Sequence, residues 1–237
     1  MIKKIIQGLN KKANQEKAKI FSRFFKTGKG EYGEGDKFLG ITVPEQRKIA
    51  KKFYKGISLE EIKTLLISKI HEYRLTTLFT LILKYKKAGV KIRKEYFDFY
   101  LKHTKYINNW DLVDVTCRDI VGEYLLDKDR TILYRLAESK DLWKRRIAII
   151  STYAFIRKNQ FLDTLRVAEI LIQDKHDLIQ KAVGWMLREV GKRDLKTEEE
   201  FLQKYCRKIG RTTLRYAIEK FPEKKRKFYL NNLFKPT

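Results

Sequence analysis

Apolar residues recur along the chain at helical spacing, and polar residues that favour helix starts divide this pattern into many short segments. Over residues 15–25, for example, Ala18, Phe21, Phe24 and Phe25 occupy the i, i+3, i+6 and i+7 positions of one helical face. No segment shows the strict alternation of polar and apolar residues that a half-buried strand requires. The hydrophobic pattern therefore predicts an all-α protein.

Three capping-box sequences mark predicted helix starts. They begin at Thr42, Ser58 and Thr197, and each has a glutamate three residues later. The first opens a helix that should end near Tyr54, with a proline in its first turn. The apolar periodicity predicts further helices near 70–87, 92–102, 109–125, 130–138, 142–157, 161–173, 177–190, 198–208 and 211–220.

The short connections between these helices indicate how the helices pack. Linkers of about two to six residues place successive helices side by side as antiparallel hairpins. Helix pairs that recur every ~35–45 residues are typical of HEAT-like or armadillo-like solenoids. We therefore expect residues 1–237 to form a single domain, a right-handed solenoid of stacked helix pairs with a concave basic face.

One segment departs from this regularity. Residues 26–40 contain Gly28, Gly30, Gly33, Gly35 and Gly40. The stretch lacks the spacing and the final Gly-Lys-Ser/Thr of a nucleotide-binding P-loop. A flexible connection between helices is therefore the favoured interpretation, and a backbone approach to a DNA phosphate stays open as the alternative.

Charge narrows the class of partner. The 237 residues include 54 Lys and Arg against 29 Asp and Glu, a formal net charge of +25. The natural counterpart of such a surface is a polyanion, which favours nucleic acid. A lysine-rich composition without functional meaning is the second interpretation, and an anionic membrane surface the third.

Other composition features exclude whole classes of protein. No run approaches the ~18 uncharged apolar residues of a membrane span, and the first residues do not resemble a secretory signal. Cys117 and Cys206 provide neither a disulfide framework nor a metal-binding pair. We therefore expect a cytoplasmic protein without a membrane partner.

A carboxylate beside a tryptophan is the first candidate for chemistry. Residues 108–114 read NNWDLVD, and Asp114 lies at the edge of the apolar helix face, one turn after Trp110. A carboxylate there is costly unless it is paired or used in function. Pairing with Arg118 at i+4 is the structural alternative. Asp111, in the first helical turn, has the position of a structural carboxylate.

Two further elements carry candidate residues. Arg146 lies on the same side of its helix as apolar neighbours. Its guanidinium must therefore either pair with a buried anion or extend to solvent. The sequence favours neither of these two interpretations. Trp185 lies off the buried stripe of its helix, near Lys181 and Arg188. A tryptophan on a basic face favours stacking on nucleic acid over packing between helix pairs.

The histidines indicate no recognisable chemistry. His71, His103 and His176 occur singly and lack the spacing of zinc ligands or of a cysteine-activating base. No serine-nucleophile motif is present. The sequence therefore disfavours hydrolysis by a metal or by a serine.

Together, these motifs resemble the AlkD-type DNA glycosylases, HEAT-like-repeat enzymes that remove alkylated bases. The resemblance runs in order along nearly the whole chain through RFFKTG (23–28), YGEGDKFLG (32–40) with Val43-Pro44, HEYR (71–74), NNWDLVD (108–114), LWKRRIA (142–148), KAVGW (181–185) and RTTLRYAIE (211–219).

This resemblance implies a function and a set of site residues. It implies excision of 3-methyladenine and 7-methylguanine from duplex DNA by a monomer without cofactor or metal, in the cytoplasm at the nucleoid. The alternative is a non-catalytic scaffold that binds DNA or RNA. The implied catalytic residues are Asp114, Arg146, Trp110 and Trp185. We expect the DNA to be contacted by Arg188, Lys181, Arg145 and Arg118.

Overall fold

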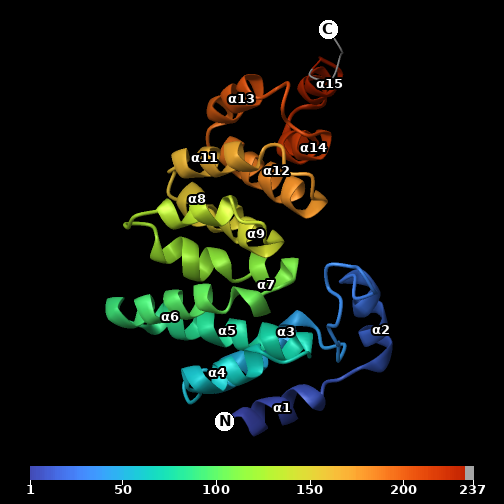
Figure 1. The fold of residues 1–237 in the computed structure, drawn as a ribbon, viewed down its shortest axis with the longest axis vertical. Coiled ribbons are helices and arrows are strands. Elements are labelled where there is room, and N and C mark those ends of the chain that lie inside the picture. Colours follow the sequence, from blue (N-terminus) through green and yellow to red (C-terminus); the bar gives the residue numbers. More distant parts are fainter. Residues whose placement is uncertain (233–237) are drawn as a thin grey trace. The chain divides into compact units, whose positions relative to one another are not determined.

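The computed structural model describes residues 1–232, which are predominantly helical (Figure 1). No strand occurs within these residues; an isolated bridge pairs Lys37 with Ile70. The all-α fold class of stacked helix pairs is confirmed. The chain divides into two compact units, unit 1 (Met1–Thr116) and unit 2 (Cys117–Thr237). The single domain, the handedness of the solenoid and its concave face stay predictions.

Unit 1 is built around one long buried helix, α5. Its faces are covered by α1, α3, α4, α6 and α7 (Figure 1). Tyrosine, leucine and phenylalanine side chains alternate on α5 with buried threonines, and the hydroxyl of Thr80 donates to the carbonyl of Thr76. The elements are α1 (Ile2–Asn10), α2 (Gln15–Phe24), α3 (Val43–Phe53), α4 (Leu59–Leu66), α5 (His71–Lys87), α6 (Val90–Lys102), η1 (Thr104–Tyr106) and α7 (Trp110–Asp114).

Unit 2 consists of shorter helices that pack in successive pairs. Close packing joins α8 to α9, α9 to α12, and α12 to α13 and α14. None of the described helices in either unit has the length and apolar character that crossing a membrane requires. The elements are the π-helix η2 (Arg118–Gly122), α8 (Thr131–Ala137), α9 (Leu142–Ser151), α10 (Tyr153–Ile156), α11 (Leu162–Leu171), α12 (Asp177–Gly191), α13 (Leu195–Lys204), α14 (Arg211–Ala217), η3 (Ile218–Lys220) and α15 (Glu223–Asn232).

Of the three predicted capping boxes, the one that begins at Ser58 is present. The Ser58 hydroxyl accepts the Glu61 N–H at 3.2 Å, and the Glu61 carboxylate accepts the Ser58 N–H at 3.1 Å. The helix after Thr42 begins as predicted, but the Thr42 side chain caps nothing, and Glu45 forms ion pairs with Lys12 and Lys48 instead.

The third predicted box is wrong. Helix α13 begins two residues earlier than Thr197, with Asp194 as its N-cap. The Asp194 carboxylate accepts the Thr197 N–H at 3.1 Å and the Thr197 hydroxyl at 2.6 Å. A carboxylate is the stronger capping group because it also interacts with the positive end of the helix dipole.

Two predicted long helices are interrupted, and two helices were not predicted. The helix expected over 109–125 is broken after Asp114, where the buried Thr116 hydroxyl donates to the Leu112 carbonyl at 2.5 Å and η2 follows. The helix expected over 142–157 is broken at Thr152, whose hydroxyl donates to the Ile149 carbonyl. Helices α1 and α15 lie outside the predicted segments.

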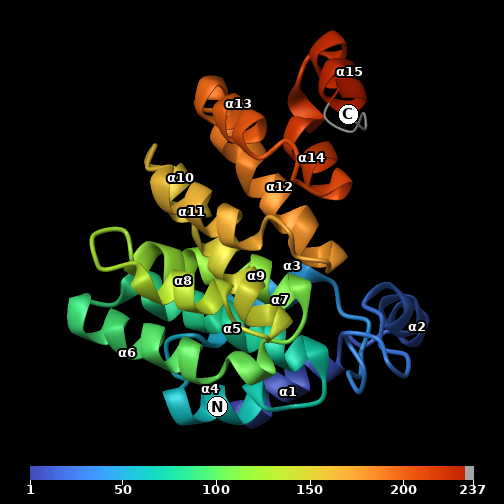
Figure 2. The same cartoon turned by 45° about the horizontal axis from the view of Figure 1, so that its top comes forward.

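Helices α12 and α14 lie side by side (Figure 2), and they approach each other closely at Gly184. A Cβ atom at this position would lie 2.4 Å from the Thr213 carbonyl oxygen and 2.5 Å from the Tyr216 Cβ. Only glycine allows this contact between backbones. The close approach sets the position of Trp185, the next residue of α12.

We expect Gly184→Ala to destabilise unit 2 by about 1–3 kcal/mol, because the added methyl group overlaps α14. Thermal unfolding followed by circular dichroism should show a Tm roughly 3–8 °C lower than that of the parent protein. Gly89→Ala is the control, since a Cβ at Gly89 meets no atom within 4 Å. Equal Tm values for the two variants would contradict the close packing.

A buried carboxyl on α13 makes unit 2 sensitive to pH. Glu198 is 1% exposed, and burial, together with the nearby charge of Glu199, raises its pKa from 4.5 to about 8. The carboxyl is therefore protonated in the folded protein at pH 7. The unfolded chain releases this proton at lower pH, so the free energy of unfolding falls as pH rises from about 4.5 to about 8.

Glu198→Gln should remove this pH dependence. We expect the parent protein to lose on the order of 3 kcal/mol between pH 5 and pH 9 through Glu198, and the variant to lose correspondingly less. Urea unfolding at both pH values measures the difference. The exposed Glu200→Gln on the same helix serves as the control and should behave like the parent. A parent-like slope in Glu198→Gln would exclude the buried carboxyl as its source.

Candidate functional site

Helix α7 carries two of the predicted site residues, Trp110 and Asp114, one turn apart. The helix has five residues, and its N-cap is the fully buried Asn109, whose side-chain oxygen accepts the Trp110 N–H at 2.8 Å. Leu112 and Val113 are fully buried, whereas Asp114 is half-buried at the C-terminal end. The helix thus anchors its apolar side and keeps the Asp114 carboxylate near the surface.

Two phenylalanines from the end of α2 hold the Trp110 ring. Phe25 stacks on it with ring centres 5.2 Å apart and planes inclined by 22°. Phe24 meets it edge-on at 5.7 Å and remains 60% exposed. Such contacts add about 0.5–1.5 kcal/mol each beyond burial and restrict the ring to one orientation.

A buried ionic network connects α7 to the start of α5. His71 Nε2 lies 2.8 Å from an Asp111 oxygen, and His71 Nδ1 lies 3.2 Å from an Asp36 oxygen. Arg74 pairs with the same Asp36 oxygen and donates to the Asn108 side-chain oxygen at 2.5 Å. Asp111 also accepts the N–H of the following residue. These contacts agree with the structural role predicted for Asp111.

The surroundings of His71 favour its charged form. Burial by itself lowers the pKa of His71, but the charge of Asp111 and the hydrogen bonds to Asp111 and Asp36 outweigh burial and raise the pKa above 6.5. The side chains of His71 and Asp36 are 2% and 5% exposed. The network therefore contains charges that pair with one another away from water.

The neighbouring Glu72 fastens the glycine-rich segment to α5. Its carboxylate accepts the backbone N–H groups of Leu39 at 3.0 Å, Gly40 at 2.8 Å and Ile41 at 3.2 Å. Gly40 has a φ of +78°, which favours glycine. Because a protein carboxylate occupies these N–H groups, this end of the segment serves as a connection between helices, the interpretation favoured by its sequence.

An apolar hollow of about 360 Å³ lies beside this network in unit 1. His71, Asp111 and the exposed ring of Phe24 are among the residues that line it. Gln46 and Glu72 also line it, and the other lining residues are aromatic and aliphatic, from α2, α3, α5 and the segment after α2: Ile20, Phe21, Phe25, Phe38, Ile41, Val43 and Leu75.

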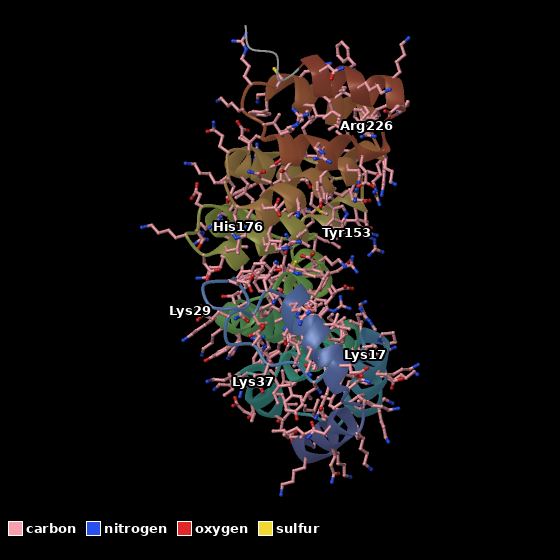
Figure 3. The ribbon with its side chains drawn as sticks, turned by 90° about the vertical axis from the view of Figure 1, so that its right-hand side faces the viewer. Lys17, Lys29, Lys37, Tyr153, His176 and Arg226 are labelled. Atoms are coloured by element: carbon pink, nitrogen blue, oxygen red, sulfur yellow. The ribbon has the colours of Figure 1, made fainter. Side chains whose placement is uncertain are left out.

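Unit 2 contributes a second group around Trp185. This ring is half-buried and lies 6.4 Å from the ring of Tyr153, which Figure 3 labels. The Arg118 guanidinium lies 5.6 Å from the centre of the Tyr153 ring. The Nε atom of Arg118 lies 3.5 Å from a carboxylate oxygen of Asp119. Arg118 and Trp185 are thus brought together through Tyr153, a residue that the sequence did not single out.

The two adjacent arginines of α9 have different surroundings. Arg146 is 5% exposed and donates to the Leu178 carbonyl at the start of α12. Arg145 forms an ion pair with Asp174 at 2.6 Å and donates to two carbonyls after α8. Arg145 therefore ties α9 to its neighbouring loops. Neither the catalytic role predicted for Arg146 nor the DNA contact predicted for Arg145 is tested by these contacts.

The other two predicted DNA contacts have acidic partners. Lys181 pairs with Asp177 one turn earlier on α12, at 2.6 Å. Arg188 pairs with Glu219, and its Nε has no hydrogen-bond partner within the described part of the chain. The DNA contacts predicted for Lys181 and Arg188 stay predictions.

Sequence reasoning missed the ionic network. The spacing of His71 is not that of a metal ligand or of a nucleophile's base, and its partners lie 35 and 40 residues away in the sequence. The sequence does contain a signal, because HEYR places a histidine, a glutamate and an arginine at the start of an otherwise buried helix. Groups buried in this way require partners of opposite charge.

Comparison with known proteins identifies the family. The family model described as DNA alkylation repair enzyme matches residues 5–221. The chain belongs to this family. The fold resembles a solved structure from Enterococcus faecalis, described as a predicted DNA alkylation repair enzyme, with a TM-score of 0.70, 18% identity, and coverage of 90% of this chain and 98% of that chain. It also resembles AlkD2 from Streptococcus mutans, with a TM-score of 0.56, 18% identity, and coverage of 88% and 99%.

No curated protein matches this alkylation repair family member significantly. Family membership confirms the resemblance found in the motifs and implies a role in DNA repair and in DNA binding. Exposed basic side chains are available in unit 1, where Lys17, Lys29 and Lys37 belong to α2 and the segment after it (Figure 3).

DNA affinity should therefore depend steeply on salt. If the net charge of +25 acts through about five phosphate contacts, the logarithm of the association constant should fall with the logarithm of the salt concentration with a slope of roughly −4 to −5. Fluorescence anisotropy with a labelled duplex at 50–300 mM salt measures this slope. An affinity independent of salt would contradict binding through the basic surface.

Proposed function

We propose that this protein is a monofunctional DNA glycosylase that hydrolyses the N-glycosidic bond of positively charged alkylated purines, 3-methyladenine and 7-methylguanine, in duplex DNA. The main support is α7, in which the half-buried Asp114 follows Trp110 by one turn and the Trp110 ring is held by Phe24 and Phe25. Membership in the alkylation repair family supports the same substrate class.

The chemistry requires an anion and a water molecule. Alkylation at N3 or N7 gives the purine a positive charge and makes it a good leaving group. Departure of the base creates positive charge on the deoxyribose, which a fixed carboxylate stabilises. In this proposal Asp114 is that carboxylate and also accepts a proton from the attacking water. The base leaves with the electron pair of the broken bond, and the water oxygen bonds to C1′.

The aromatic and basic residues bind the DNA around the reacting sugar. The faces of Trp110 and Trp185 attract the cationic sugar and exclude water. Arg146 holds a backbone phosphate through a charge-assisted hydrogen bond. Arg118, Arg145, Lys181 and Arg188 contribute further phosphate contacts. None of these steps uses a cofactor or a metal, and a monomer in the cytoplasm, bound to the nucleoid through DNA, is sufficient for them.

Asp114→Asn should abolish most of the excision and leave DNA binding intact. The amide keeps the size of the side chain but removes the anion, a loss of on the order of 3 kcal/mol of transition-state stabilisation, or about a hundredfold in rate. Removing a negative charge near phosphates should leave affinity equal or increase it. The measurement is the release of 7-methylguanine from methylated duplex DNA under single-turnover conditions.

Asp98→Asn is a better control than a change at Asp111, because Asp98 is exposed on α6 in the same unit and pairs only modestly with Lys94, whereas Asp111 belongs to the buried network. Asp98→Asn should excise at the parent rate. Parent-level excision by folded Asp114→Asn would exclude Asp114 as the catalytic carboxylate. A parent protein that binds DNA but releases no base would favour the non-catalytic scaffold.

A further inference from the structure

His71 connects the motifs that surround α7. It begins α5, contacts Asp111 on α7 and contacts Asp36 in the glycine-rich segment. We propose that His71 is a positioning residue for the excision reaction: its imidazole holds Asp111 and Asp36 together and thereby fixes the orientation of α7 and of Trp110 and Asp114. This inference rests on the proposed glycosylase function, in which Trp110 and Asp114 contact the substrate.

Helix α7 needs external support because it is short. Five residues form little more than one turn, and isolated helices of this length are unstable in water. Its orientation therefore depends on contacts to the rest of unit 1. Arg74 holds Asn108 just before the helix, and His71 holds Asp111 within it. Both anchors come from the first turn of α5.

A second path leads from His71 to Trp110 through aromatic rings. The imidazole stacks on Phe38 with ring centres 4.5 Å apart, and it lies 5.1 Å from the ring of Phe25. Phe25 in turn stacks on Trp110. The same side chain thus supports α7 through a hydrogen bond and supports the tryptophan through its packing.

The network is balanced when the imidazole carries a proton on each nitrogen. The imidazolium and Arg74 then neutralise the carboxylates of Asp36 and Asp111, and each ring N–H donates to a carboxylate. Glu72 is the remaining charged group of this turn of α5, and its carboxylate faces the N–H groups of residues 39–41.

Loss of the proton changes one of the two contacts. Arg74 Nη2 lies 3.3 Å from His71 Nδ1, so a neutral ring can accept a hydrogen bond from Arg74 there while its Nε2–H still donates to Asp111. The direct contact to Asp36 is lost in that state. Since the charge of Asp111 and the hydrogen bonds to Asp111 and Asp36 raise the pKa of His71, the doubly protonated ring that holds both carboxylates persists to higher pH than an ordinary imidazolium does, and the contact to Asp36 is lost as the pH rises further.

The pH profile of excision tests this role. Release of 7-methylguanine by the parent protein, measured in single turnovers between pH 6 and pH 9.5, should fall on the alkaline side as His71 loses its proton. His71→Gln should excise about tenfold more slowly, because small displacements of catalytic groups are costly, and should lack this alkaline decrease. Its DNA affinity should stay within about twofold of the parent value, because His71 is 1% exposed and presents no surface for a phosphate contact.

His103→Gln is the matched control. His103 is also buried in unit 1, but its Nδ1 contacts only the Phe99 carbonyl on its own helix among the hydrogen bonds of the described residues. This variant should keep both the parent rate and the alkaline decrease. A parent-like rate and profile in His71→Gln would overturn the proposal.

An NMR titration of the parent protein tests the positioning role without His71→Gln and without measuring base release. It therefore applies even if the variant does not fold or the parent releases no base. The indole N–H resonance of Trp110, assigned in NMR spectra with Trp110→Phe, should shift with pH together with the imidazole resonances of His71. A Trp110 resonance that stays constant while His71 titrates would overturn the positioning role. Absence of base release would instead count against the glycosylase function alone.

Discussion

The ion pairs between His71, Asp36, Asp111 and Arg74 are the interaction on which unit 1 depends. They join three segments that are distant in the sequence: the glycine-rich connection, the start of α5 and the short helix α7. Removing one partner of a buried ion pair typically costs about 3–5 kcal/mol, because the other charge remains buried without compensation. The candidate catalytic helix is therefore held by these ion pairs and by the burial of Leu112 and Val113, rather than by its own helical stability.

The basic residues that we expect to contact DNA are also paired with acidic residues within the protein. The contact of Lys181 with Asp177 is an exposed i,i+4 pair, worth about 0.3–0.5 kcal/mol, and a phosphate can replace the aspartate at little cost. Arg145 is different, because its ion pair with Asp174 is largely buried and two carbonyls accept from the same guanidinium. A phosphate contact by Arg145 must therefore leave this ion pair and these carbonyl contacts in place, because they hold α9.

The sequence predicted what depends on local periodicity. In α9, for example, the buried residues Trp143, Ile147 and Ile150 recur at the helical spacing that predicts a helix in this part of the chain. It did not predict the break after Asp114, because that break involves a hydroxyl of Thr116 that contacts Tyr100, from another helix, at 2.8 Å. The sequence also did not predict that Asp36 and Asp111 are the partners of His71, since no local pattern pairs positions 35 and 40 residues apart.

The identity of the product tests the central claim most directly. A duplex with one 7-methylguanine, incubated with the parent protein, should yield free 7-methylguanine and a strand that is intact until alkali cleaves it at the abasic site. Mass spectrometry of the base and gel analysis of the strand measure both products. A duplex recovered with its methylated base still attached, although the protein binds it, would contradict the glycosylase function.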